Sequence, residues 1–345
     1  MALLANAQEA ATPATPAEDL IELDTALVIG EQPGPGLWKV TSGDNVMWVL
    51  ADYGPLPKDM IWRSAQVEGR IAESQEVLYP PNVNIHPSIG IARAITLIPS
   101  ALKVGKNPDG ASLQEVLDAD TYARWSAVRD RIITKKKEVE DLEEWRPGVA
   151  VSMLGGKAFE KSGLVSGQVT KVVHEATKKH KVRVNRLPTL DRAVKWEDPR
   201  GMLKSAARKL GTPELDCFRR GLDTLEPGVE AAKVRANAWS RGDIAKLRAL
   251  HRGFEPRDDC IYMLIAGFSE LDGANAASAK KMLADMEWHA EQGRVQAQRN
   301  WVAAARIALE KNRSTFSMLP VGDVLRADGH LEKLRALGYM VEEPL

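Results

Sequence analysis

The sequence predicts an α/β protein, and three features of its pattern support that class. Apolar runs separated by turn residues, between residues 26 and 50, are typical of β-strands. Helical spacing of apolar residues then dominates the chain from about residue 112 to residue 312. A strand-like run follows at residues 316–321, so strands stand near both ends of the sequence and helices between them.

The first predicted elements are strands at residues 26–29, 37–40 and 46–50. Residues 42–45, which read Ser-Gly-Asp-Asn, are turn formers, so the second and third strands should form a β-hairpin. Beyond the hairpin, Ser64 is placed to cap a helix, because apolar residues stand four apart at Val67 and Ile71.

Helices are predicted for most of the middle of the chain. Ser112 and Glu115 fit a capping box, and residues 122–132 continue the helical spacing. The segment 214–250 is helical with one interruption at residues 242–243. An apolar residue recurs every seven positions in a further helix that ends near Asn312, which predicts a core-facing stripe made of Trp288, Val295, Val302 and Leu309. After the strand at 316–321, a last helix is expected at 331–337 and a last strand at 339–341.

Composition narrows the classes of function. With 345 residues, 44% of them hydrophobic, the chain can bury a large core, and we expect one domain over residues 26–345. Lys+Arg and Asp+Glu both number 47, so no net charge favours a polyanion and nucleic-acid binding is unsupported. No apolar run reaches the roughly 20 residues that span a bilayer, which predicts a soluble protein without a membrane span.

The N-terminus and the two cysteines bear on the compartment. Residues 1–25 are interpreted either as a disordered Ala-rich arm or as the remnant of a secretory signal, with Ala5 and Ala7 in a small-residue cleavage pattern. In the second case the protein is periplasmic or otherwise extracytoplasmic, and Cys217 and Cys260 form a candidate disulfide. That bridge would close a loop of about 43 residues and contribute roughly 4 kcal/mol. In the alternative, a cytoplasmic protein, the two residues are ordinary thiols.

Several blocks of the sequence together resemble the TraB/GumN family, which includes the Tiki proteases. They are residues 36–62, residues 235–243, the pair Arg299-Asn300 and residues 321–339. The resemblance extends from about residue 36 to residue 341. It implies a mixed central β-sheet flanked by helices, with a long helical middle region. It also implies a divalent-metal hydrolase whose metal is bound by two imidazoles, one from each of two Gly-x-x-His motifs.

Both motifs are missing from this chain. The first corresponds to residues 51–54, where Ala51 replaces the glycine and Gly54 the histidine; in the second, Leu325 stands in place of the histidine. The family's acidic residue has no clear equivalent either, because Glu76 comes a few positions early. What the resemblance leaves is a set of remnant site candidates: Asp52, Tyr53, Arg299, Asn300 and Asp323.

Three hypotheses follow for the function. The first is a catalytically degenerate family member that binds a peptide or protein partner in the remnant cleft, with no metal or other cofactor. The second is a peptidase-like hydrolase that binds a divalent metal ion through substitute carboxylates, Asp52, Glu76 and Asp323. The third is an interaction protein that uses the helical middle region. The six histidines are assigned surface or packing roles: His86, His174, His180, His251, His289 and His330.

Overall fold

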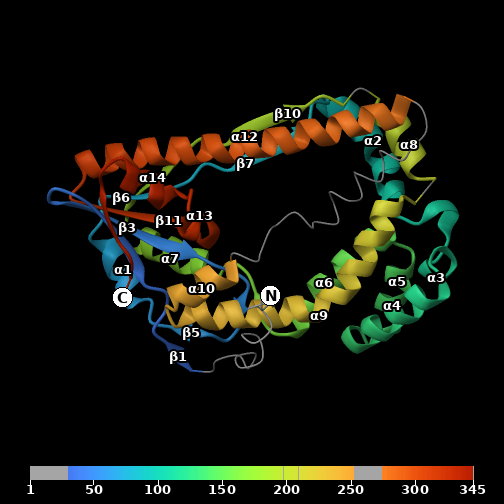
Figure 1. The fold of residues 1–345 in the computed structure, drawn as a ribbon, viewed down its shortest axis with the longest axis horizontal. Helices are drawn as coiled ribbons and strands as arrows, with labels where there is room; N and C mark the ends of the chain where they lie inside the picture. The colour runs from blue at the N-terminus through green and yellow to red at the C-terminus, as the bar shows by residue number, and fades with distance from the viewer. Residues whose placement is uncertain (1–29, 197, 209, 252–273, 345) are drawn as a thin grey trace, which may run out of the picture.

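The computed structural model describes residues 30–196, 198–208, 210–251 and 274–344. Its centre is a six-stranded mixed sheet, which confirms the predicted α/β class (Figure 1). The strand order is β12 (Met340–Glu342), β2 (Leu37–Ser42), β3 (Asn45–Asp52), β11 (Ser314–Pro320), β6 (Glu76–Tyr79) and β9 (Arg183–Arg186). The strand predicted at residues 26–29 lies outside the described residues, and the single domain predicted over residues 26–345 stays a prediction.

The predicted hairpin is confirmed as β2 and β3. They pair antiparallel, with Leu37 opposite Leu50 and Ser42 opposite Asn45, and Gly43 takes a φ of 57° in the turn. That left-handed backbone suits glycine because it has no Cβ. Val49 and Leu50 are both fully buried although they point to opposite faces, so the sheet is covered on both sides.

Segments from the two ends of the sequence are neighbours in the sheet. Strand β11 lies between β3 and β6 and pairs parallel with both. The register places Pro320 beside Asp52, while β12 pairs antiparallel with β2 at the outer edge. The carboxyl ends of β3, β6 and β11 therefore lie together at the same end of the sheet.

Helices cover both faces of this sheet. Helices α1 (Ala65–Ala72) and α7 (Gln168–Lys179) lie on one face, and the C-terminal half of α12 (Ala274–Lys311) lies on the other (Figure 1). Helices α10 (Ile244–His251), α13 (Val321–Leu325) and α14 (His330–Ala336) complete this core. Helix α1 begins after Ser64 as predicted, although the Ser64 hydroxyl donates to Glu68 instead of capping the helix main chain.

The helical middle region forms a second core. It contains α9 (Thr212–Ser240), α6 (Pro147–Lys161), α3 (Leu113–Val116), α4 (Ala119–Ile132) and α5 (Lys136–Glu143). The capping box of Ser112 and Glu115 is present, and α4 starts anew with the Asp118 carboxylate accepting from the Thr121 main-chain N–H. The predicted break after α9 occurs at Gly242. Two pairs of short strands follow. Strands β4 (Leu56–Pro57) and β8 (Leu164–Val165) pair antiparallel, and β1 (Glu31–Gln32) and β5 (Ile61–Trp62) pair parallel.

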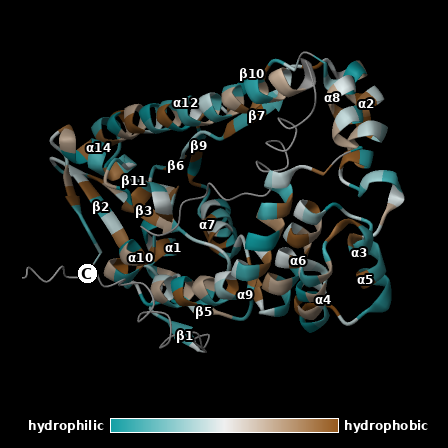
Figure 2. Ribbon diagram, turned by 45° about the vertical axis from the view of Figure 1, so that its right-hand side comes forward, coloured by the Kyte–Doolittle hydropathy of each residue, from teal (hydrophilic) through white to brown (hydrophobic). Residues whose placement is uncertain are grey.

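A third core lies at the far end of α12, where α2 (Ile91–Val104) packs on α8 (Pro199–Ala206) (Figure 2). A parallel pair of strands, β7 (Val83–Pro87) and β10 (Leu190–Val194), runs along α12 toward this end. The predicted α12 stripe is correct only in part: Val302 and Leu309 are buried against the sheet, but Trp288 is 60% exposed because α12 has left the sheet at that point. Among the described helices, none combines the length and apolarity that crossing a membrane requires.

Candidate functional site

A cleft lies at the end of the sheet where the parallel strands have their carboxyl ends. Its first part has a volume of about 250 Å³. The lining combines charged and polar side chains with apolar ones, namely Asp52, Tyr79, Pro80, Asn82, Arg186, Leu187, Thr189, Met318, Leu319 and Pro320. This end is the usual ligand-binding position in open α/β sheets, because the loops that leave the strands surround it.

A second part of about 350 Å³ continues the cleft toward α12. The two parts share Pro80, Asn82 and Pro320, so they adjoin. The second part is lined mainly by residues 80–85, which lead into β7, and by α12. Asp323 of α13 and His330 of α14 complete it, and its polar residues on α12 are Arg294 and Gln298. We refer to the two parts together as the sheet-end cleft.

Asp52, the last residue of β3, lines the first part of the sheet-end cleft. Burial raises the pKa of its carboxyl, and hydrogen bonds with the Thr170 side chain and the Tyr53 main chain act in the opposite direction. Nearby, the Arg186 guanidinium lies over the Tyr79 ring at 4.4 Å from its centroid. A half-buried acid, an aromatic face and a cation thus stand at one opening.

Tyr53 points away from the sheet-end cleft toward α9. Its hydroxyl accepts a hydrogen bond from Arg235 Nε at 3.3 Å and donates to the Ala232 carbonyl at 3.4 Å. Burial raises the pKa of this phenol. One residue back, the Ala51 carbonyl accepts from Trp239 Nε1 at 2.8 Å. These bonds attach the end of β3 to α9, and they place the Tyr53 side chain outside the sheet-end cleft.

His330 lines the second part of the sheet-end cleft and was assigned a packing role from the sequence. Its side chain is 4% exposed, and neither ring nitrogen reaches the geometry of a standard hydrogen bond with a described residue, although the Asp323 main chain lies beside the ring and favours its charged form. The ring packs edge-on against Trp301, with centroids 5.2 Å apart. Burial lowers the pKa of the imidazole, and the Asp323 carboxylate opposes that shift. A lone histidine at a helix start carries no pattern that could have marked it in advance.

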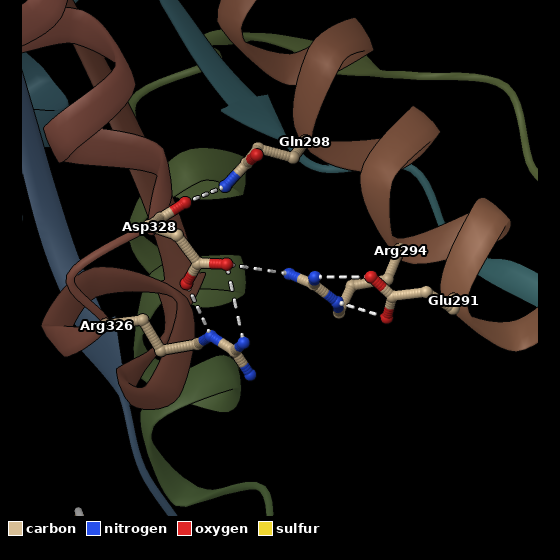
Figure 3. A network of polar contacts seen from close by, with 5 residues as sticks. All are labelled: Glu291, Arg294, Gln298, Arg326 and Asp328. Atoms are coloured by element: carbon tan, nitrogen blue, oxygen red, sulfur yellow. Dashed lines mark hydrogen bonds and ion pairs between the residues drawn. The ribbon is translucent and has the colours of Figure 1, made fainter.

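A network of charges holds α12 against the segment between α13 and α14 (Figure 3). Arg294 donates to both carboxylate oxygens of Glu291, at 3.0 and 2.7 Å, and lies 3.7 Å from Asp328. Arg326 also donates to Asp328, at 2.9 Å, while Gln298 donates to its carbonyl at 2.6 Å. Because the Arg294 charge is already matched, this network fixes one wall of the sheet-end cleft and does not offer an open anion site.

The remaining family-derived candidates stand outside the sheet-end cleft. Arg299 is exposed on α12. Asn300 is half-buried and accepts a hydrogen bond from Gln296, one turn earlier on the same helix, at 2.7 Å. Neither residue lines either part of the cleft. Of the five candidates, the structure therefore brings only Asp52 and Asp323 to one site.

The residues present do not fit the metal that the family resemblance implies. Gly54 has no ligating side chain and lies near Ser166, while Leu325 is buried in the sheet core. Within the described ranges, no group of three or more His, Cys, Asp and Glu side chains is arranged to hold a metal ion.

The proposed carboxylate set does not converge either. Glu76 starts β6, where it binds Arg183 and accepts from Asn312. Thr315 of β11 pairs with both Glu76 and Met47, which places Glu76 at the level of Met47. Asp52 lies five residues further along β3, roughly 16 Å at the usual strand rise. The structure therefore does not bring Glu76 to Asp52 and Asp323.

The disulfide prediction involves a residue that the structure does not describe. Cys217 is buried on α9, with 3% of its surface exposed. Cys260 lies outside the described residues. Pairing of the two residues therefore stays a prediction.

The comparisons with known proteins agree with the sequence resemblance. A model of the TraB/PrgY/gumN family matches residues 36–343, which is nearly the whole chain. Searches of curated proteins and of solved structures gave no significant match. The match includes the hairpin, the helical middle region and the C-terminal strands that build the sheet-end cleft. The chain therefore belongs to the TraB/PrgY/gumN family.

Proposed function

We propose that this protein is a catalytically degenerate family member that binds a peptide or protein segment in the sheet-end cleft. One observation carries the proposal. The cleft is present at the carboxyl ends of β3, β6 and β11, but Gly54 and Leu325 stand where the resemblance requires imidazoles. A binding site without its metal ligands supports recognition better than hydrolysis.

The chemistry of the lining supports a peptide ligand. Main-chain amides need polar partners, which Asn82 and Thr189 can provide, and apolar side chains need surfaces such as Leu187 and Met318. Asp52 and Arg186 place both signs of charge in the same part of the cleft. The two adjoining parts together provide about 250 and 350 Å³, which is room for several residues of a peptide segment.

The competing function is a metal-dependent hydrolase that uses carboxylate ligands. The observation in its favour is that Asp52 and Asp323 line adjoining parts of one cleft. Against it, Glu76 belongs to the other end of the sheet and is engaged with Arg183 and Asn312. Carboxylate oxygens suit hard cations, but such sites take six or more ligands in total.

Blocking the sheet-end cleft tests the binding proposal. Asn82 is exposed and lines both parts, so Asn82→Trp should fill the cleft without disturbing a core. Asn84→Trp is the matched control, because Asn84 is exposed nearby and lines neither part. The probe is a displayed library of random linear peptides selected on the wild-type protein.

The expected result is that selected peptides bind the wild type and Asn84→Trp alike, and bind Asn82→Trp about tenfold or more weakly, a loss of roughly 1.4 kcal/mol. Equal binding to all three proteins would place the peptide site elsewhere. Hydrolysis of casein that requires added zinc, manganese or cobalt and disappears in Asp52→Ala would instead establish the hydrolase.

A further inference from the structure

One carboxylate in the second part of the sheet-end cleft stands apart from the polar network beside it. Asp323 is half-buried in the first turn of α13 and lines this part. Within the described ranges, its side chain takes part in no hydrogen bond and no ion pair. The charged side chains of the neighbouring network on α12 and before α14 are paired with one another instead (Figure 3).

The charges at this place do not cancel. The network in Figure 3 contains two carboxylates and two guanidinium groups, so its own charges balance. Asp323 adds a third carboxylate, which interacts electrostatically with Arg294, and one negative charge is therefore in excess. His330 does not offset it, because burial lowers the pKa of its imidazole and the ring is neutral at pH 7.

Apolar side chains form most of the remaining wall. More than half of the residues that line the second part are proline, alanine, valine or isoleucine, and they come from residues 80–85, from α12 and from the end of β11. The cavity thus combines apolar walls with one carboxylate that has no cation of its own. Lysine and arginine side chains match this combination, because each has an apolar stem and a cationic tip.

We propose that the second part of the sheet-end cleft recognises a lysine or arginine side chain of the bound segment, and that Asp323 selects it. The inference rests on the proposed function, since it requires a peptide segment in the cleft. The cationic tip would donate a charge-assisted hydrogen bond to the Asp323 carboxylate, and such bonds are stronger than those between neutral groups. An acidic side chain is disfavoured there, because the Arg294 charge is already matched by Glu291 and Asp328.

Asp323→Asn tests this selection, because it removes the charge and keeps the size of the side chain. Asp285→Asn is the matched control, since Asp285 is also half-buried, stands on α12 and lines neither part of the cleft. Neither aspartate is fully buried, so both variants should fold, and far-UV circular dichroism verifies it.

The probes are synthetic peptides selected on the full-length wild type from a displayed library of random linear peptides. Each lysine or arginine of a peptide is replaced in turn by methionine, which keeps an apolar stem and removes the charge. We expect one basic position whose replacement weakens binding to the wild type and to Asp285→Asn about tenfold. The same replacement should change binding to Asp323→Asn by no more than about twofold, because the pair is already broken there.

Two results would overturn the inference. One is a set of peptides that lose binding to Asn82→Trp but contain no basic residue, or bind Asp323→Asn as tightly as the wild type. The cleft would then bind peptides without this selection, and the proposed function would stand. The other is a selection that yields no binder, or only peptides that bind Asn82→Trp as well as the wild type, which would remove the proposed function together with the inference.

Discussion

At the scale of single residues, the unpaired imidazole of His330 is the most unusual feature of the sheet-end cleft. It is buried against Trp301, whose own Nε1 donates to Ser317 Oγ at 3.1 Å, while Ser317 donates in turn to the Leu78 carbonyl at 2.8 Å. The Trp301 and Ser317 groups are thus satisfied, whereas the imidazole nitrogens form no well-aligned hydrogen bond and have only the Asp323 main chain beside them. A buried polar atom without a partner costs on the order of 1–3 kcal/mol.

Replacing His330 by Phe should therefore keep or increase stability at neutral pH, because the Trp301 contact remains and the unpaired nitrogens are removed. The pKa of His330 is lowered in the folded protein, so the unfolded chain binds the proton more tightly. Wild-type stability should fall as the pH falls through about 6.5 toward the folded pKa. The advantage of His330→Phe should grow over that interval in urea unfolding. A difference in unfolding free energy between the wild type and His330→Phe that does not change with pH would contradict this prediction. His174→Phe is the control, because His174 is exposed.

Asp52 gives the opposite pH dependence. Burial raises the pKa of its carboxyl in the folded protein, so the folded state holds the proton more tightly than the unfolded chain does. The stability contribution of protonated Asp52 should be lost as the pH rises from about 3.9 through the raised folded pKa. Asp52→Asn cannot titrate, so the difference in unfolding free energy between the two proteins should change across that interval. Parallel curves for the wild type and Asp52→Asn would show that the pKa of Asp52 does not rise on folding.

Only part of the candidate site could be predicted from the residues. Asp52 and Asp323 reach one cleft because Asp52 ends β3 and Asp323 lies in the first turn of α13, directly after the neighbouring parallel strand β11. Strand ends follow from sequence pattern. Tyr53 and Asn300 do not reach the cleft, because the direction of a side chain depends on what packs beside it. Tyr53 is held by α9, and Asn300 by Gln296 on the same helix. His330 was missed because one histidine alone forms no motif.

At the scale of elements, one buried ion pair joins α6 and α9 of the middle region to α8 of the third core. Arg146, just before α6, donates to Glu214 in the first turn of α9 at 2.7 Å and to the Ala206 carbonyl of α8 at 2.6 Å. The two side chains are 2% and 1% exposed. Either ion alone would be a buried charge without its partner, which is costly in a low-dielectric interior.

Arg146→Met and Glu214→Leu should each destabilise the protein by about 3–5 kcal/mol, and the double variant by less than either one. Urea unfolding followed by circular dichroism measures all three in one cycle. The exposed pair Arg131 and Glu226, both more than half exposed, is the control, and its removal should cost at most about 1 kcal/mol. Additive effects of Arg146→Met and Glu214→Leu would show that the pair is not coupled.

Most helices and strands could be predicted from the sequence, and the stripe on α12 shows the limit of such predictions. Turn residues identified the β2–β3 hairpin, and Ser112 with Glu115 identified the start of α3, because those signals are local. The stripe on α12 was expected to be core throughout, yet Trp288 is exposed. Periodicity shows which residues share a side of a helix, but not where along its length a partner covers that side.

At the scale of the whole molecule, strands from both ends of the chain pair in one sheet, and the match to the family covers the same span. The family resemblance predicted a mixed central sheet, but no local signal in the sequence shows that β3 and β11 are neighbours.

The compartment stays a prediction. If the protein is exported, Cys217 and Cys260 should form one disulfide, and thiol titration of denatured, non-reduced protein purified from the periplasm should find no free thiol. Two free thiols in that material would contradict the bridge.

We propose that the sheet-end cleft works without the metal site that the family resemblance implies. Elemental analysis of the purified full-length protein by inductively coupled plasma mass spectrometry, after incubation with zinc, manganese and cobalt and removal of free ions, tests it most directly. Because Gly54 and Leu325 cannot coordinate a metal and Glu76 lies at the other end of the sheet, we predict well under one equivalent of any of the three metals. One tightly bound ion per chain that is lost in Asp52→Ala or Asp323→Ala would contradict the claim and establish the carboxylate-ligated hydrolase instead.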